Sequence, residues 1–212
     1  IEGLLEQAES LVGVSQTQLA TNIVSSDEQG VDMACNLALC MHRIVDCFKN
    51  ILEVEVQESD KEEEKIPTAV KCKLVLVERL LMNLLTNAIR HGRAMELHST
   101  ALMPKAKCVF KLRYEHITDD QYDWDGFVHI SYYDDGLGYS KEYIERFNQW
   151  AEDPMQFLLN ESKLRGMAQL CGDLAFWHGA KMRIAEENEV FGTGAAFHMR
   201  MPVKLLDSTT KE

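Results

Sequence analysis

Apolar residues recur along this chain with two different periods, and these periods divide it into helices and strands. A spacing of three and four residues, typical of amphipathic helices, predicts helices at Ile1–Val12, Glu28–Asn50, Lys73–His91, Lys141–Trp150 and Leu164–His178. Alternating apolar and polar positions, or β-rich composition, predict strands at Ile51–Gln57, Cys108–His116, Phe127–Tyr133, Lys181–Ala185 and Ala195–Met201. A further short strand is compatible with Leu19–Val24. Lys73–His91 has the broadest apolar face of the five predicted helices.

The order of these elements indicates an α+β fold. Polar loops at Thr118–Gly126 and Glu186–Gly194 join the last four strands into two hairpins, which require antiparallel pairing. Helices and strands in this order favour layers rather than regular βαβ repeats. We expect a two-layer α/β sandwich, in which helices cover one face of a mixed, mostly antiparallel sheet.

Charge and composition exclude several classes of protein. The 212 residues include 22 Lys and Arg and 34 Asp and Glu, which gives a formal net charge of −12. This is the wrong sign for a nucleic-acid binder, and no apolar run is long enough to predict a membrane span. The first residues lack the basic region of a signal peptide. The six cysteines form no C-x-x-C pair, so we expect reduced thiols in a cytoplasmic protein.

Three short motifs carry the candidate chemistry. Asn83 and Asn87 lie one turn apart on the predicted helix 73–91, and an amide oxygen is a hard ligand suited to Mg²⁺. Asp134 follows a strand and opens Asp-Asp-Gly-Leu-Gly, whose Gly136 and Gly138 permit a tight backbone. The carboxylate of this Asp can accept a hydrogen bond from an exocyclic amine such as that of adenine. The third motif places Gly192 and Gly194 just before the last strand.

In this order and spacing, the motifs resemble those of the GHKL family of ATP-binding domains, and most closely the catalytic domain of sensor histidine kinases. Asn83–His91 is similar to the family's N box, Asp134–Gly138 to its first glycine box, and Gly192–Phe197 to its last. The resemblance implies a Bergerat-type fold that binds ATP and Mg²⁺ between the N-box helix and a flexible lid.

The resemblance also implies roles for individual residues. Asn87 would coordinate Mg²⁺, with Asn83 one turn before it, and Asp134 would bond the adenine amine. The glycines at 136 and 138 would shape the adenine pocket. Arg90 and His91 stand where the family places side chains that contact phosphate or nucleotide; for each of them a plain surface role is the alternative.

The residue at position 83 selects a branch of the family. Hydrolytic members carry a Glu there that activates water, whereas Asn83 is not a general base. The resemblance therefore implies a sensor kinase, which transfers the γ-phosphoryl group to a His. No motif of this chain reads as that acceptor, so it would lie on a dimerisation domain of the same or a partner chain. A homodimeric full-length protein and a response-regulator receiver are the further partners implied.

One motif departs from the family. Where alternating glycines would cradle the phosphates, the chain reads Ser162-Lys163-Leu164-Arg165-Gly166, and only Gly166 matches. A backbone cradle at a helix start binds phosphate through N–H groups, and bulky residues would narrow it. The alternative function is therefore a non-catalytic signalling or interaction module with the same fold.

The chain divides into three parts on this interpretation. Residues 1–17 are expected to be the tail of a preceding dimerisation-type helix and a linker. Residues 18–206 form the ATP-binding domain, and residues 207–212 a polar tail.

Overall fold

A computed structural model of the chain describes residues 33–91, 105–118, 123–153, 155–156 and 167–206. Along these residues it contains strands β1 (Met33–Cys35), β2 (Glu53–Glu58), β3 (Val70–Cys72), β4 (Lys107–His116), β5 (Gly126–Asp134), β6 (Lys181–Ile184) and β7 (Ala196–Leu205). The helices are α2 (Leu37–Phe48), α3 (Leu74–His91), α4 (Lys141–Glu152) and α6 (Met167–His178), with a short 3-10 turn at Glu62–Glu64. The predicted elements at Ile1–Val12 and Leu19–Val24 lie outside the described residues, as do Gly166 and the tail 207–212.

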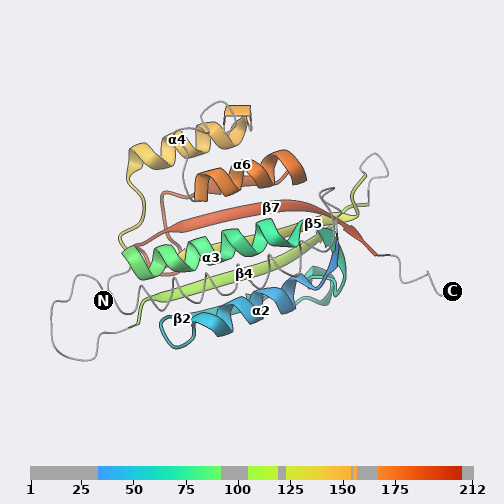
Figure 1. The fold of residues 1–212 in the computed structure, drawn as a ribbon, viewed down its shortest axis with the longest axis horizontal. Helices are drawn as coiled ribbons and strands as arrows, with labels where there is room; N and C mark the ends of the chain where they lie inside the picture. Colours follow the sequence, from blue (N-terminus) through green and yellow to red (C-terminus); the bar gives the residue numbers. More distant parts are fainter. Residues whose placement is uncertain (1–32, 92–104, 119–122, 154, 157–166, 207–212) are drawn as a thin grey trace.

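The strands form one mixed sheet in the order β1-β3-β7-β5-β4-β2. Strand β6 pairs with β7 on the edge away from β5, the same edge that pairs with β3. The pairs β4–β5, β5–β7 and β6–β7 are antiparallel, whereas β2 runs parallel to β4. Figure 1 shows the helices gathered on one face of this sheet, with α3 across its centre. The predicted fold class, an α+β sandwich with helices on one face of a mixed sheet, is confirmed.

The alternation of side chains along β4 shows how the two faces differ. Cys108, Phe110, Leu112 and Tyr114 are buried, and they point toward the helices. Lys111, Arg113 and Glu115 point to the opposite face. Because β5 and β7 follow the same register, the hydrophobic core lies between the sheet and α3, α4 and α6.

The predicted helix Glu28–Asn50 was too long at its start. Met33–Cys35 instead forms β1, which pairs antiparallel with β3 so that Cys35 faces Val70. The helix begins after Asn36, whose side-chain oxygen accepts the N–H of Leu39 at 2.8 Å, as a helix cap does. Strand β3 was not predicted, because three residues are too few to establish a period.

The last strand runs further than predicted, through Pro202 to Leu205. The carbonyl of Val203 accepts the N–H of Asp125, so the backbone hydrogen-bonding groups of Val203 point toward β5. Those of its neighbour Pro202 point toward the opposite edge of β7. On that edge β6 pairs up to Arg200 and β3 begins at Lys204. The missing N–H of the proline therefore falls in the gap between two neighbouring strands, where no ladder bond is needed.

The cysteines are free thiols, and all but Cys47 are buried. The thiol sulfurs of Cys35 and Cys72 lie 3.2 Å apart on β1 and β3. Within the described ranges, His, Cys, Asp and Glu side chains form no group that would hold a metal ion. No helix in the same ranges has the length and apolar character needed to cross a membrane.

Candidate functional site

The carboxylate of Asp134 is the centre of a buried hydrogen-bond network at the end of β5. Its Oδ1 accepts the backbone N–H groups of Gly136 and Ala195, each at 2.9 Å. Its Oδ2 accepts the hydroxyl of Tyr132 at 2.9 Å. Burial is the first cause that raises the pKa of Tyr132 well above its ordinary value, so this phenol keeps its proton and donates it to the carboxylate. The network fixes the carboxylate and uses three of its four acceptor sites.

Two predicted glycines meet beside Asp134, although they come from distant parts of the chain. Gly194 has φ +95°, and a Cβ there would lie 1.9 Å from the carbonyl oxygen of Asp134. Gly138 has φ +75°, and its Cβ would lie 2.9 Å from the carbonyl oxygen of Gly194. Both positions therefore combine a left-handed backbone with a contact that excludes any side chain. The first and last glycine motifs form one surface.

Helix α3 brings the asparagine motif to the same place. The hydroxyl of Tyr132, which donates to Asp134, also lies 3.2 Å from the carbonyl of Leu84 on this helix. Near its end, the carbonyl of His91 accepts the N–H of Leu137 at 3.3 Å. The motif at 83–91 thus packs along the loop that follows Asp134.

The two predicted asparagines of α3 are half-buried and hydrogen-bonded to each other. Asn87 donates from Nδ2 to Oδ1 of Asn83 at 3.1 Å. This bond turns the amide nitrogen of Asn87 toward Asn83 and leaves Oδ1, the atom that can ligate Mg²⁺, on the other side of the amide. In the part of the chain that the structure describes, no donor reaches that oxygen.

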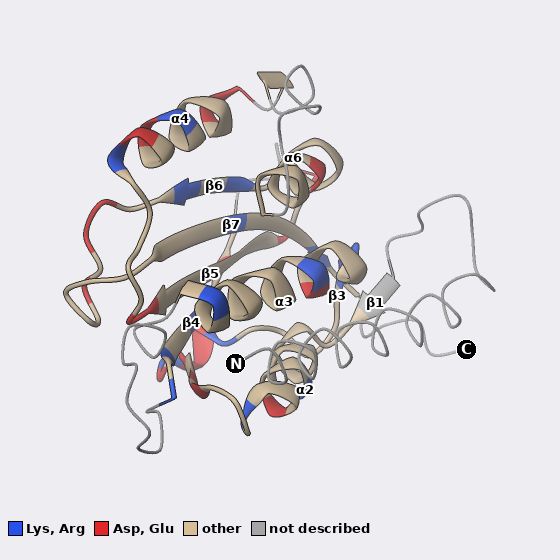
Figure 2. Cartoon of the chain, turned by 60° about the vertical axis from the view of Figure 1, so that its left-hand side comes forward, with Lys and Arg blue, Asp and Glu red and all other residues tan. Residues whose placement is uncertain are grey.

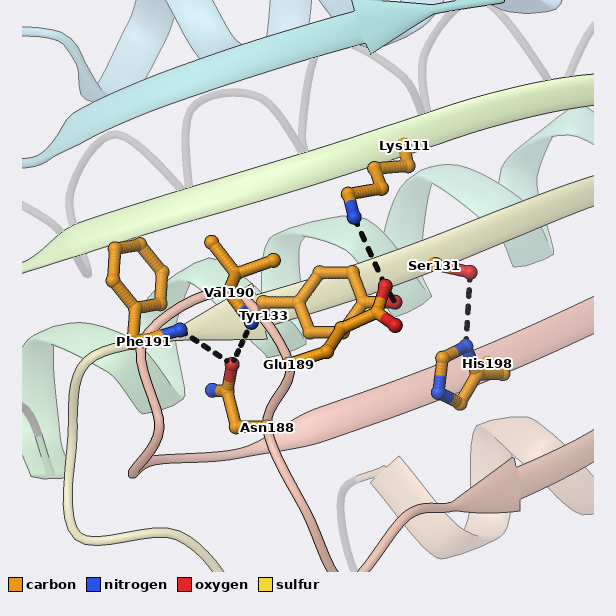
Figure 3. A network of polar contacts seen from close by, with 8 residues as sticks. All are labelled: Lys111, Ser131, Tyr133, Asn188, Glu189, Val190, Phe191 and His198. Carbon is orange, nitrogen blue, oxygen red and sulfur yellow. Dashed lines mark hydrogen bonds and ion pairs between the residues drawn. The ribbon is translucent and has the colours of Figure 1, made fainter.

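Asn188 organises the site and was missed by sequence reasoning. This buried side chain donates to the carbonyls of Asp134 and Ala195 at 2.8 and 3.0 Å. Its oxygen accepts the N–H groups of Val190 and Phe191 at 3.1 and 3.0 Å, and Figure 3 shows these two bonds. Asn188 thereby ties the loop before β7 to the end of β5. The available signal was an asparagine inside a loop that leads to a glycine motif, but loops use asparagine for many local turns.

The other predicted residues are less closely involved. Arg90 and His91 are exposed in the last turn of α3, where positive charge favours the helix dipole. Gly192 has φ +73° in an exposed turn, and a Cβ there would meet nothing within 4 Å. Glu78 faces away from the asparagines and accepts the thiol of Cys40 at 3.2 Å.

The short loop after Gly138 leads into α4, and on the way its Tyr139 contacts the start of α6. The hydroxyl of Tyr139 lies 3.5 Å from the sulfur of Met167, the first residue of that helix. The altered phosphate motif, which includes Gly166, immediately precedes α6 and lies outside the described residues. Cavities of about 490 and 370 Å³ lie elsewhere in the fold, and neither is lined by Asp134 or Asn87.

Comparison with known proteins gives matches in structure. No protein-family model matches the sequence, and no curated protein does. The mycobacterial sensor histidine kinase MprB matches with a TM-score of 0.52 at 16% identity, over 83% of this chain and 100% of MprB's. The catalytic domain of histidine kinase ThkA gives 0.51 at 16% identity, over 82% of this chain and 99% of its own.

A third match is to full-length ShkA in complex with AMPPNP, with a TM-score of 0.51 at 12% identity. It covers 85% of this chain but 32% of ShkA. At these identities the likeness concerns the fold: the chain has the architecture of histidine kinase catalytic domains.

Proposed function

We propose that this chain binds ATP with Mg²⁺ and serves as the catalytic domain of a histidine kinase, transferring the γ-phosphoryl group to a His outside this chain. The observation that carries the proposal is the meeting of three separate motifs around Asp134, in a fold shared with histidine kinase catalytic domains. A glycine motif that served only as a local turn would not be expected to lie beside the two other motifs.

The adenine ring would lie against Asp134 and the glycine surface. The carboxylate has one acceptor site beyond the three it uses, and the exocyclic amine of adenine is a donor that fits it. The absence of side chains at Gly138 and Gly194 lets the two glycine loops pack against each other beside Asp134, and a flat base would lie against these loops. A fixed, buried carboxylate also discriminates against a base that presents an acceptor at the same position.

The metal and phosphates would lie along α3. Oδ1 of Asn87 is a neutral oxygen ligand of the kind Mg²⁺ accepts together with phosphate oxygens, and Asn83 holds the amide in this orientation. Arg90 and His91, one turn further along, would meet the negative charge of the phosphates. When bound, Mg²⁺ would neutralise charge on the transferred phosphoryl group.

The chemistry available to the chain's own residues is binding and positioning. Asn83 cannot activate water, since an amide is no general base, and this favours transfer to a protein acceptor over hydrolysis. The acceptor His would belong to a dimerisation domain, in the same chain or its partner within a homodimer. A response-regulator receiver would take the phosphoryl group next.

A second candidate function follows from the altered glycine motif, Ser162-Lys163-Leu164-Arg165-Gly166. Side-chain charges at Lys163 and Arg165 can attract phosphates, but they do not reproduce a cradle of backbone N–H groups. With such a motif, the domain would bind nucleotide weakly and act as a non-catalytic signalling or interaction module.

Titration with ATP, ADP and adenosine, with and without Mg²⁺, tests the proposal and separates the two functions. If the chain binds ATP with Mg²⁺ much more tightly than adenosine, and salt changes this affinity little, the result supports the kinase function. Similar affinities for ATP and adenosine, with ATP binding lost steeply as salt rises, support the module with an impaired cradle. No binding of any of the three refutes nucleotide binding.

The adenine contact is tested separately at Asp134. Asp134→Ala should cost about 1–3 kcal/mol of adenosine affinity because it leaves the amine unpaired. Asp134→Asn, which can keep a bond to Tyr132, guards against a simple loss of folding. Unchanged affinity in a folded Asp134→Ala variant would place adenine elsewhere.

A further inference from the structure

The face of the sheet opposite the helices carries two adjacent rows of four side chains, and seven of these eight are Lys, Arg or His. The strand register aligns the first row across β4, β5, β7 and β6 as Lys111, Ser131, His198 and Arg183. It aligns the second row in the same way as Arg113, His129, Arg200 and Lys181. We call these eight residues the basic rows. Figure 3 looks onto this face, with Lys111, Ser131 and His198 in front of the strands and α3 behind them.

The positive charge of the basic rows is only partly balanced. Lys111 pairs with Glu189 at 2.9 Å, and Arg200 lies 3.5 Å from Glu115. For Arg113, Lys181 and Arg183, the described residues supply no ion pair. Figure 2 shows the basic residues of β6 at the edge of the sheet. Three cations without an ion pair among the described residues thus share one face of a chain whose net charge is −12.

Positive neighbours contribute, after burial, to the lowered pKa values of the two histidines on this face. Burial is the main cause that lowers the pKa of His198, and the charge of Arg183 lowers it further. His129 also has a lowered pKa, first through burial and then through Arg113 and Arg200, which together with burial outweigh the opposing Glu115. Both rings are therefore neutral at neutral pH and can serve as hydrogen-bonding groups.

A hollow continues the second row toward the loop before β5. It has a volume of about 490 Å³ and is lined by Phe127, Trp124 and Pro202 together with Arg200, Lys181 and Glu115, among others. The guanidinium carbon of Arg200 lies over the ring of Phe127, 3.4 Å from its centre, as in cation–π pairs. Its buried Nε has no hydrogen-bond partner within the described ranges. The lining of the hollow therefore combines apolar side chains with two cations and one carboxylate.

We propose that the basic rows and this hollow form a docking surface for an acidic segment of a partner protein, which places one apolar side chain beside Phe127 and Trp124. Carboxylates would pair with Arg113, Lys181 and Arg183, and burial of the apolar residue would anchor the segment. Asp134 points to the helix-covered face, so docking leaves the nucleotide site accessible. The proposal does not depend on nucleotide binding.

The same features favour a short acidic polypeptide over a nucleic acid. Glu53 and Glu55 lie on β2 at the other edge of this face, so the positive charge is confined to one half of the sheet. The overall charge of −12 would repel a long polyanion at distance. A phosphate backbone also offers no apolar side chain for the hollow.

The test measures binding of a fluorescein-labelled peptide of about twelve residues, rich in Glu with a pair of central leucines, by fluorescence anisotropy. Lys181→Glu combined with Arg183→Glu reverses two exposed charges that have no partner among the described residues, so the fold should persist, as a thermal melt would show. The control, Lys49→Glu with Lys141→Glu, changes the net charge by the same amount, just after α2 and at the start of α4.

We expect the β6 variant to bind the peptide about tenfold more weakly than the parent, and the control to change by about twofold or less. A peptide with serines in place of the leucines should bind the parent about fivefold more weakly. Equal losses in the two variants would show a general charge effect and overturn the proposal. So would tighter binding of duplex DNA than of peptide, or no peptide binding at about 1 mM.

Discussion

Removing the side chain of Asn188 should both destabilise the domain and weaken nucleotide binding. Asn188→Ala deletes four hydrogen bonds, of 2.8, 3.0, 3.1 and 3.0 Å. Each contributes about 1 kcal/mol net. After the change, water can solvate the backbone N–H groups of the half-buried Val190 and Phe191. The carbonyl of Ala195 still accepts a hydrogen bond from the N–H of Asp134. We therefore expect a loss of roughly 2–3 kcal/mol in the free energy of unfolding.

The effect on the site follows from what these bonds hold. The loop of Asn188 carries the N–H of Ala195, which donates to Asp134, so loss of the tether loosens the carboxylate. ATP affinity should fall about tenfold, because a misplaced acceptor loses much of its contact. Urea denaturation measures the stability, and calorimetry measures the affinity.

Asn148 on α4 provides a matched control that makes no hydrogen bond to Asp134 or Ala195 among the described residues. It also makes two hydrogen bonds to a strand end, to and from Ile184, both at 2.9 Å. Asn148→Ala should cost roughly 1–2 kcal/mol of stability and leave ATP affinity within about twofold. If Asn188→Ala destabilised the domain but bound ATP as tightly as Asn148→Ala does, the link between this loop and the site would be refuted.

Three further predictions concern single residues. Asn87→Ala should weaken Mg²⁺-dependent ATP binding more than metal-free adenosine binding, as titrations of both ligands would show; equal losses would mean that Asn87 is structural. Gly194→Ala should destabilise the domain by about 3 kcal/mol or more in urea, since its Cβ would collide with the backbone, whereas Gly192→Ala in open space should cost about 1 kcal/mol; similar costs would contradict the close contact. The pKa of His129 is lowered in the folded state, mainly by burial. The neutral ring therefore contributes its full stability above the pKa of the unfolded state, about 6.5, and this stability is lost as the pH falls from there toward the pKa of the folded state. Urea midpoints at about pH 7.5 and 5.5 should differ less in His129→Gln than in the parent, and an equal difference would argue against this titration.

Sequence periodicity was sufficient for the long elements and failed for the short ones. The 18 residues of α3 and the ten of β4 each repeat their pattern several times, so the period is unambiguous. Strands β1 and β3 have three residues each and stabilise one another across the sheet. A pattern that depends on a distant partner is not visible in a local window.

The residues of the candidate site likewise include some that the sequence indicated and some that it did not. Asp134 and Gly194 were proposed from the sequence because three motifs occur together in the order and spacing of one family, although each motif alone is typical of a turn. Asn188 was not, because its role depends on the carbonyls of Asp134 and Ala195, which approach it only after β5 and β7 have paired. The basic rows were hidden for the same reason, since they are assembled from single residues of four strands.

The contact between Asp134 and Ala195, 61 positions apart, has a consequence for how the protein is made. During synthesis the asparagine helix and the first glycine loop leave the ribosome well before β7, and domains fold as their complete units emerge. Until the last strand is added, Asp134 lacks one of its two backbone donors and the glycine surface has only one side. A nascent chain that stops before β7 should therefore be unable to hold the geometry of this site, and long-range pairing of this kind is slow compared with helix formation. Assembly of the site would be a late event, one that reports completion of the sheet.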